Sequence, residues 1–435
     1  MGHDLAQHAL VHGSPKGVPH TVTHPHDDAP CAPLPLRNAH AEGRVHTRGL
    51  PRPVMLAPWP TGLLPEDAEG TVPTPWGPVT VLSGSIEALL ATTDGRWGVA
   101  LEGATVEATC ADRHGRWFLA ELDGASYDVL MCAFGTGRAL SSLAQHADRT
   151  EALRSTYRVQ LPVGGCTLDG HDVLFIWPQA SRVGISDVDL LDQFRAAGAV
   201  LGALEPWSTP PVERRWNDAM ATVEQRLGTS TLWRAPHDRA TVGLPDLQLS
   251  MHSLVDGEQG PRFRPLPRTV DEALTDVVGR RPGLAHAMAL EGEAVEAGRG
   301  SDAGGPEAWF NAWSDGAPAA WSNPRAQSTY RGGLWIWRYA NVMRWRGRAL
   351  AWDDDELQAA TQSWLEDVDR LQARLGVLRM WRSLLWLGAA GVAAAWYAHA
   401  LGSLTQTASL ALAGASIAVA AGGWVRYRAA EPGPF

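Results

Sequence analysis

The C-terminal segment from Ser383 to Val425 contains no Asp, Glu, Lys or Arg, and this feature constrains the chain more than any other. Two apolar stretches lie within it, Ser383–Leu404 and Thr407–Val425, separated only by a short polar link at Ser403–Thr407. As helices that rise ~1.5 Å per residue, each would span roughly 30 Å, which matches the hydrocarbon core of a bilayer. The alternative is a buried helical pair in a soluble core. Two adjacent uncharged stretches of this length favour a transmembrane helical hairpin instead.

Basic residues flank both ends of this hairpin, and its link carries no charge. By the positive-inside rule, this asymmetry predicts that both ends lie in the cytoplasm. The segment Met1–Pro60 contains no apolar run of signal-peptide length, so the N-terminal bulk is expected in the cytoplasm too. The chain has 36 Arg and a single Lys (Lys16), a bias that is typical of a GC-rich bacterial genome. Together with the hairpin, this bias predicts a multi-pass protein of the bacterial inner membrane. The flanking arginines are Arg374, Arg379, Arg382, Arg426 and Arg428.

Small residues at four-residue spacing predict close helix packing within the membrane. They are Gly391 and Ala395 in the first span and Gly414, Ala418 and Gly422 in the second. Either the hairpin packs on itself through them or it packs on another membrane protein.

Aromatic residues near the span ends are expected at the membrane interface. They are Trp381, Trp386, Trp396 and Trp424. His399 is the one ionisable side chain inside a span, and it lies within about a turn of the link. We therefore expect it to be solvated at the interface.

The rest of the chain divides by composition into further segments. Residues 1–72 form a disordered or extended arm rich in His and Pro, 73–210 a β-rich and then α/β domain, and 211–352 a mainly helical, Trp-rich part. Residues 353–382 form an amphipathic juxtamembrane helix, 383–428 the hairpin and 429–435 a tail. The predicted fold class is an α+β cytoplasmic domain followed by the two-helix transmembrane hairpin.

Short apolar or alternating runs separated by turn residues predict an antiparallel sheet. The runs are PVTVLSG, IEALLATT, WGVALEG, ATVEATCAD and RWFLAELDG, between Pro78 and Gly124. A helix is expected over 138–154, strands over Tyr157–Leu161 and Asp172–Trp177, and helices over Val188–Leu204, 212–228 and part of 270–306.

Tryptophans dominate the segment before the membrane, and we interpret them as core residues because each ring buries a large apolar area. They are Trp309, Trp313, Trp321, Trp335, Trp337, Trp345, Trp352 and Trp364. A helix that starts near Asp353–Asp355 is predicted to continue into the first span. Its apolar a/d stripe packs either on the soluble domain or on a partner. The stripe is Leu357, Trp364, Val368, Leu371, Leu375 and Leu378.

Several functional classes are disfavoured by the sequence. A net charge of −10 argues against nucleic-acid binding. The four cysteines (Cys31, Cys110, Cys132 and Cys166) have no CxxC spacing and read as free thiols. The stretch His20–Asp28 has ligand types for a transition metal, but nothing fixes its geometry, so neither a metal site nor a cofactor is predicted.

The loop Leu244–Ser250, within LPDLQLSMHSLV, resembles the catalytic loop of aminoglycoside phosphotransferases, which reads like HGDLHLGN. These enzymes have a protein-kinase-like fold, and the resemblance covers about residues 73–350. It implies that Asp246 stands at the catalytic-base position. The alternative is that this segment is merely a loop and a strand.

Other positions depart from the pattern of that family. Met251 or His252 replaces the metal-binding Asn, and Arg262–Pro267 offers no counterpart of the second metal-binding Asp. The strand expected to carry the ATP lysine, RWFLAEL, has Ala120 at that position. Because phosphoryl transfer depends on neutralisation by Lys and metal, the resemblance implies a pseudokinase used for binding.

A second segment, Tyr127–Leu140, resembles motif I of S-adenosylmethionine-dependent methyltransferases, commonly VLDLGCGTG. Gly135 and Gly137 match its last two glycines and would contact the cofactor. Met131 replaces the usual acidic residue and Ala133 the first glycine. The two resemblances compete for the same residues, so at most one can hold.

The sequence therefore predicts a non-catalytic, cytoplasm-facing binding or scaffold subunit of a bacterial membrane assembly. Its expected partners are the lipid bilayer and other integral membrane subunits. The rival is a membrane-anchored transferase, either an S-adenosylmethionine-dependent methyltransferase or a divergent phosphotransferase.

Overall fold

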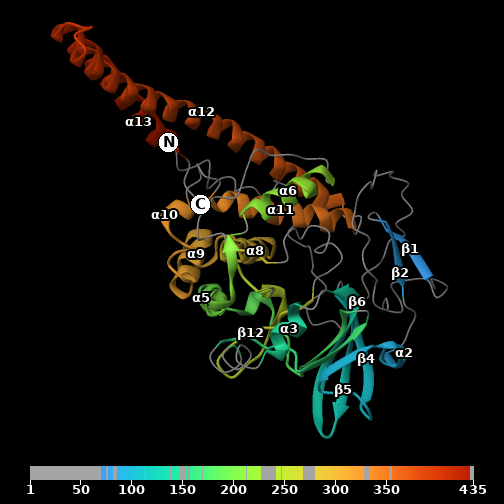
Figure 1. Ribbon diagram of the computed structural model, residues 1–435. Helices are drawn as coiled ribbons and strands as arrows, with labels where there is room; N and C mark the ends of the chain where they lie inside the picture. The colour runs from blue at the N-terminus through green and yellow to red at the C-terminus, as the bar shows by residue number, and fades with distance from the viewer. Residues whose placement is uncertain are drawn as a thin grey trace.

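The computed structural model of the chain shows a sheet at one end, a helical body in the middle and a long helical hairpin that projects from the body (Figure 1). The residues that it describes are 70–74, 77–81, 86–112, 114–136, 139–146, 153, 157–168, 170–211, 213–226, 242–245, 247–267, 280–327, 333–351 and 355–431. The predicted arm over 1–72 lies outside the described residues except for 70–72, which form part of a strand.

A six-stranded sheet, antiparallel at every pairing, forms the β-rich part, as the alternating runs predicted. The strands are β3 (Gly95–Gly98), β4 (Thr105–Asp112), β5 (Gly115–Leu122), β6 (Ala125–Thr136), β7 (Gly164–Leu168) and β8 (His171–Pro178). Their order is β3-β7-β8-β6-β5-β4. The turn between β5 and β6 places Asp123 and Gly124 at φ values of 51° and 80°, which Asp and Gly tolerate better than bulkier residues. A separate hairpin pairs β1 (Gly70–Thr74) with β2 (Gly77–Val81).

Two predicted strands are wrong, and of the run WGVALEG only Trp97 and Gly98 lie in a strand, β3. The run IEALLATT forms the helix α2 (Ile86–Thr92), because Ile86, Leu89 and Leu90 share the i, i+3, i+4 spacing of one helix face. The run Tyr157–Leu161 forms only an isolated bridge, between Val159 and Phe263.

Four predicted helices are found. The helix expected over 138–154 is described as α3 (Ala139–Gln145). The next ones are α5 (Leu190–Ala203), capped by the Asp189 carboxylate, then α6 (Glu213–Arg226) and α8 (Gly283–Glu296). They are followed by α9 (Gly305–Gly316), α10 (Pro324–Gln327) and α11 (Gly333–Ala351). Short elements connect them: η1 (Ile185–Asp187), η2 (Glu205–Trp207), β9 (Thr209–Pro211), β10 (Val242–Gly243), η4 (Met251–Ser253), β11 (Leu254–Val255), β12 (Arg262–Phe263) and η5 (Asp302–Gly304).

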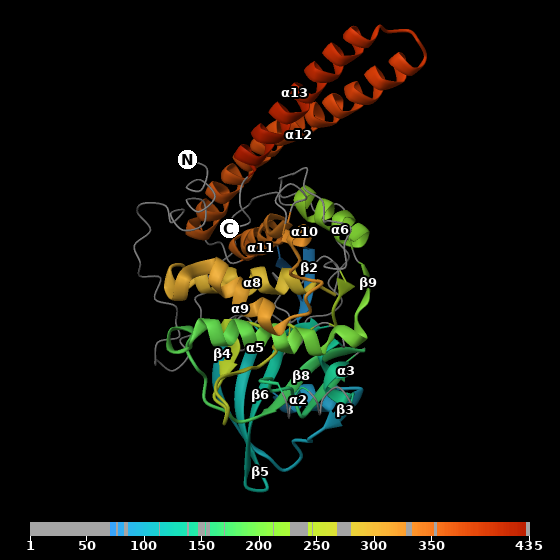
Figure 2. The same ribbon diagram turned by 90° about the vertical axis from the view of Figure 1, so that its left-hand side faces the viewer.

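The helical body is layered on the sheet through α5, which lies between the sheet and the pair α8 and α9 (Figure 2). Helices α5 and α9 approach closely, because a Cβ on Gly316 would lie 2.6 Å from the backbone nitrogen of Ala199. The core continues into α11 through the predicted tryptophans, of which Trp309, Trp313, Trp321, Trp335 and Trp337 are all at most 3% exposed. The interpretation of these tryptophans as core residues is confirmed.

The predicted juxtamembrane helix and first span form one uninterrupted helix, α12 (Asp355–Ala400), of 46 residues. Its N-terminal half packs on the body, where Trp364 meets Trp335 with ring centroids 6.3 Å apart. Trp364 of the predicted stripe therefore contacts the helical body, and Leu365 beside it is also buried. The chain turns over 401–405 and returns as α13 (Gln406–Ala430) beside α12.

Candidate functional site

The loop that resembles a phosphotransferase catalytic loop lies in the helical body, where the backbone N–H of Leu244 donates to the carbonyl oxygen of Arg281. Asp246 itself lies outside the described residues. Its neighbours Leu244 and Leu247 are fully buried. Met251 is also buried, and its backbone N–H donates to the Glu293 carboxylate at 2.7 Å. Of the two residues at the position expected for a metal-binding Asn, Met251 therefore faces the core, and His252 is half-buried.

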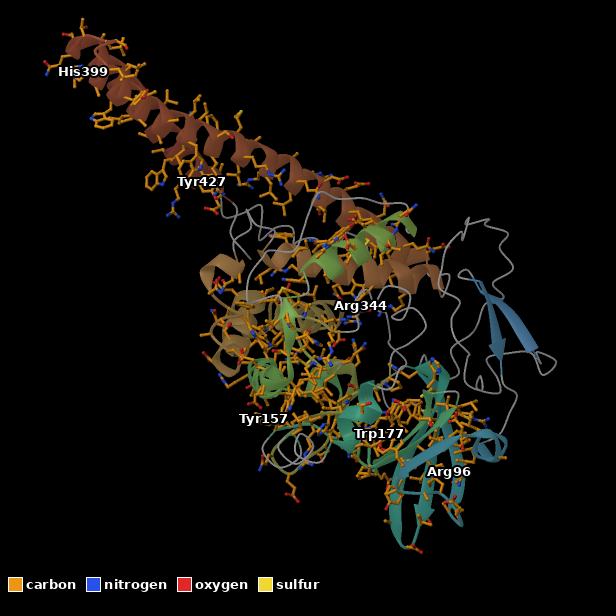
Figure 3. All side chains as sticks on the ribbon, viewed as in Figure 1. Arg96, Tyr157, Trp177, Arg344, His399 and Tyr427 are labelled. Atoms are coloured by element: carbon orange, nitrogen blue, oxygen red, sulfur yellow. The ribbon has the colours of Figure 1, made fainter. Side chains whose placement is uncertain are left out.

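A buried ion pair joins the sheet to the helical body. Arg264, directly after β12, extends one Nη2 to Oδ2 of Asp128 on β6 at 2.7 Å. Its side chain is 4% exposed, and that of Asp128 is 21% exposed. Asp128 also accepts the backbone N–H of Ala180 at 3.3 Å, just beyond the end of β8. We call this contact region the sheet–body junction, and Trp177 marks its place in Figure 3.

Further contacts enclose the guanidinium of Arg264. Its Nε donates to Oε1 of Gln160 at 2.7 Å, and its guanidinium carbon lies 5.9 Å from the Trp177 ring centroid. Burial lowers the pKa of Arg264 from its ordinary value, and the charge and hydrogen bond of Asp128 oppose that shift. An arginine keeps its proton under such a shift, so the junction holds a desolvated cation on one carboxylate.

This arrangement bears directly on phosphoryl transfer. Arg264 lies within Arg262–Pro267, the segment in which the family resemblance calls for a metal-binding acid. A guanidinium there repels a divalent cation instead of binding it. Among the residues that the structure describes, no three His, Cys, Asp or Glu side chains are grouped so that they could hold a metal ion.

The position expected for the ATP lysine is a core position. Ala120 lies on β5, is fully buried and pairs with Tyr127. No other strand of the sheet supplies a lysine in its place, since the only lysine of the chain is Lys16.

The sheet topology contradicts the methyltransferase alternative. Nucleotide-type cofactors bind where a strand of an open parallel sheet turns into a helix. Here β6 pairs antiparallel with both β5 and β8, and Gly135 lies within that strand. Gly137 lies outside the described residues.

The hairpin packs through small residues, but only one predicted stripe is used. On α12, Ala395 is fully buried, and a Cβ on Gly391 would collide with the Ser416 hydroxyl. On α13 the predicted stripe of Gly414, Ala418 and Gly422 is exposed, and nothing lies within 4 Å of a Cβ added at Gly414 or Gly422. The face of α13 that meets α12 is formed by Ser409, Ser416 and Gly423.

Close approach of the two helices centres on Gly388, where a Cβ would lie 2.6 Å from the backbone oxygen of Ser416. Gly388→Leu should therefore destabilise the hairpin by roughly 1–3 kcal/mol, because overpacking forces the backbones apart. The matched control is Gly414→Leu, whose added side chain meets only open space. Thermal unfolding of the full chain in detergent measures the difference, and equal effects of the two variants would contradict this packing.

The interfacial aromatics are strongly exposed. Trp386, Trp396 and Trp424 are 62%, 72% and 52% exposed, respectively. Trp381 is half-buried, with the guanidinium carbon of Arg426 5.9 Å from its ring centroid. His399 lies at the outer tip of the hairpin, where a ring nitrogen is 3.3 Å from the Leu404 carbonyl oxygen (Figure 3). The predicted position of His399 next to the link is confirmed.

Of the helices that the structure describes, α13 is long and apolar enough to cross a membrane. The predicted first span is the C-terminal part of the longer helix α12. Three of the cysteines are described, and all three are free thiols. Burial raises the pKa of Cys166 to about 11, and burial followed by the charge of Asp172 raises the pKa of Cys132 well above its usual range.

No family model matches the chain, and no curated protein matches it either. Solved structures do. They include a spectinomycin phosphotransferase in complex with ADP and spectinomycin (11% identity, TM-score 0.34, covering 65% of this chain and 92% of that chain). A glucosamine kinase in complex with glucosamine, ADP and inorganic phosphate is 12% identical (TM-score 0.38, 67% and 86%). A microcompartment-associated aminopropanol kinase is 14% identical (TM-score 0.35, 66% and 96%).

Proposed function

We propose that this protein is a membrane-anchored, kinase-like binding subunit that does not transfer phosphoryl groups. Its hairpin spans the inner membrane twice and holds the sheet and the helical body at the cytoplasmic surface. The soluble domain then serves as a docking platform for other membrane proteins.

The distribution of exposed hydrophobic residues carries the anchoring half of the proposal. Every large hydrophobic side chain that is exposed, among the residues that the structure describes, lies on α12, α13 or their link. An exposed apolar surface of this extent is a liability in water and is accounted for by lipid. The residues are Val377, Met380, Trp386, Leu387, Trp396, Tyr397, Leu401, Leu410, Leu412, Ile417, Val419, Trp424 and Val425.

Both helices share this surface, which supports two spans instead of one. Trp386 to Tyr397 belong to α12, and Leu410 to Val425 belong to α13. From Arg382 to the end of α12, and from the start of α13 to Arg426, each helix rises roughly 27–30 Å without a charged residue. The two helices therefore reach across a bilayer of the same thickness.

The ion pair of Arg264 supports the second part of the proposal, that the protein does not transfer phosphoryl groups. Phosphoryl transfer needs cations that neutralise the transferred group, supplied by Lys and by metals held on acids. In this chain the corresponding segment carries a guanidinium that is already committed to Asp128. The site is therefore suited to hold the two parts of the domain together and not to activate a phosphate.

Topology is tested by placing single cysteines at Ser403 and at Arg428 in the full chain, with the native cysteines replaced. A membrane-impermeant maleimide should label Ser403→Cys from the periplasmic side only and Arg428→Cys from the cytoplasmic side only. If both positions react from the same side, α13, which lies between them, does not cross the membrane.

The rival phosphotransferase is tested on the purified full chain with ATP and Mg²⁺. A ligand at 100 times its dissociation constant stabilises a protein by about 2.7 kcal/mol, which a thermal unfolding scan resolves easily. We expect no release or transfer of the γ-phosphate. Turnover above that of a buffer blank would overturn the non-catalytic role, whereas nucleotide binding without turnover would leave it standing.

A further inference from the structure

The five arginines that flank the hairpin come together at one level of its length. Arg374 donates from Nε to the carbonyl oxygen of Ala430 at 3.3 Å. A Cβ on Gly423 would lie 2.9 Å from the backbone of Trp381 and of Leu385. These contacts place 374–385 of α12 beside 423–430 of α13. Together, the arginine belt consists of Arg374, Arg379, Arg382, Arg426 and Arg428.

The belt is strongly positive. Over 374–382 and 423–431 the chain carries these five arginines and a single acid, Glu431. Glu431 accepts a hydrogen bond from the Tyr427 hydroxyl at 3.1 Å. Arg379, Arg426 and Arg428 are exposed. Four net positive charges are therefore concentrated on one short stretch of a chain whose net charge is −10.

Two of these guanidiniums lie over tryptophan rings. The guanidinium carbon of Arg428 lies 5.8 Å from the ring centroid of Trp424, and that of Arg426 lies 5.9 Å from that of Trp381. A guanidinium in a cation–π contact still offers the N–H donors in its own plane, which match the oxygens of a phosphate. The rings at the same time fix the arginines at the level where Trp side chains prefer to lie.

The location of the belt selects the ligand. Exposed apolar side chains extend from it along the hairpin to the uncharged tip, and the soluble domain lies on its other side (Figures 1 and 3). Tyr427 in Figure 3 marks this level. The belt thus stands where the headgroups of one leaflet would surround the hairpin. Basic clusters at this position attract anionic lipid.

We propose that the arginine belt binds the phosphate groups of anionic phospholipids in the leaflet that faces the soluble domain. This inference rests on the proposed membrane anchoring. The bound lipids would neutralise the belt and fix the depth of the hairpin, and with it the height of the soluble domain above the membrane.

The experiment offers full-length protein in detergent to two vesicle populations at once, and the detergent is then removed. One population is phosphatidylcholine alone, and the other contains about one third phosphatidylglycerol. Protein recovered with each population is measured after flotation. The test variant is Arg379→Gln/Arg426→Gln/Arg428→Gln. The control, Arg195→Gln/Arg214→Gln/Arg370→Gln, removes the same charge from arginines with side chains 53%, 92% and 74% exposed that pair with nearby acids.

We expect wild type and the control to prefer the anionic vesicles by about tenfold or more, and to lose that preference at high salt. The belt variant should insert into both populations with no preference. Equal partitioning of the wild type between the two vesicles would overturn the lipid specificity and leave the anchoring intact. A preference that persists in the belt variant would also overturn it. Failure of the wild type to float with either population would overturn the anchoring itself.

Discussion

Arg338→Met is expected to destabilise the soluble domain by about 3–5 kcal/mol. Arg338 on α11 makes a two-pronged ion pair with Glu291 on α8, with distances of 2.6 and 2.8 Å. Both side chains are at most 4% exposed, so water cannot replace the lost partner. The variant leaves the Glu291 carboxylate buried without its cation, and this desolvation cost is larger than the net worth of the pair.

Urea unfolding of the full chain in detergent, followed by circular dichroism, measures this loss. Replacing both partners, in Arg338→Met/Glu291→Leu, should recover most of it, because a buried pair exchanged for apolar groups is often neutral. The control Arg370→Met removes an exposed pair with Asp367 and should cost at most ~1 kcal/mol. A small effect of Arg338→Met on its own, like that of the control, would show that the pair is solvated.

Periodicity and composition predicted much of the fold, because both reflect interactions between residues that are close together in the chain. Turn residues such as Asp123 and Gly124 mark the strand ends, and the uncharged segment up to Val425 marks the hairpin. The continuity of α12 was predictable because no proline interrupts the segment that carries its apolar stripe. The helix α2 was missed because a run of seven residues shows only two turns of its period, which an apolar strand imitates.

The sequence alone did not determine which face of α13 packs against α12. In a helix as rich in Ala and Gly as α13, small residues recur at four-residue spacing on several faces. The pattern of Gly414 and Gly422 was therefore as good a prediction as that of Ser416 and Gly423. Only the angle at which α12 crosses decides between them.

The sheet–body junction was likewise only partly predictable from the sequence. The resemblance of Leu244–Ser250 to a phosphotransferase loop implies a metal-binding Asp within Arg262–Pro267, and the sequence has none there. Nothing in the sequence pointed to the partners of Arg264, since Gln160 lies 104 positions away and Asp128 further still. An ion pair across such a distance along the chain is specified by tertiary packing, which a single sequence does not display.

Arg264→Met should destabilise the protein by about 3 kcal/mol, at the lower end for a broken buried pair because Asp128 retains some contact with water. The loss has two physical sources. The carboxylate of Asp128 loses its cation, and the side-chain oxygen of Gln160 loses the hydrogen bond that it accepts from Arg264. Because these groups connect β6 and the segment before β7 to the turn after β12, the variant should also loosen the sheet from the helical body.

Hydrogen exchange, together with urea unfolding, separates the two consequences. Amides of β11 and β12 should exchange faster in Arg264→Met, whereas those of α13, in the projecting hairpin, should keep their protection. The double variant Arg264→Met/Asp128→Leu should regain most of the stability, since both charges leave the interior together. If that double variant were as unstable as the single one, Arg264 would act through its packing on Trp177 and not through its charge.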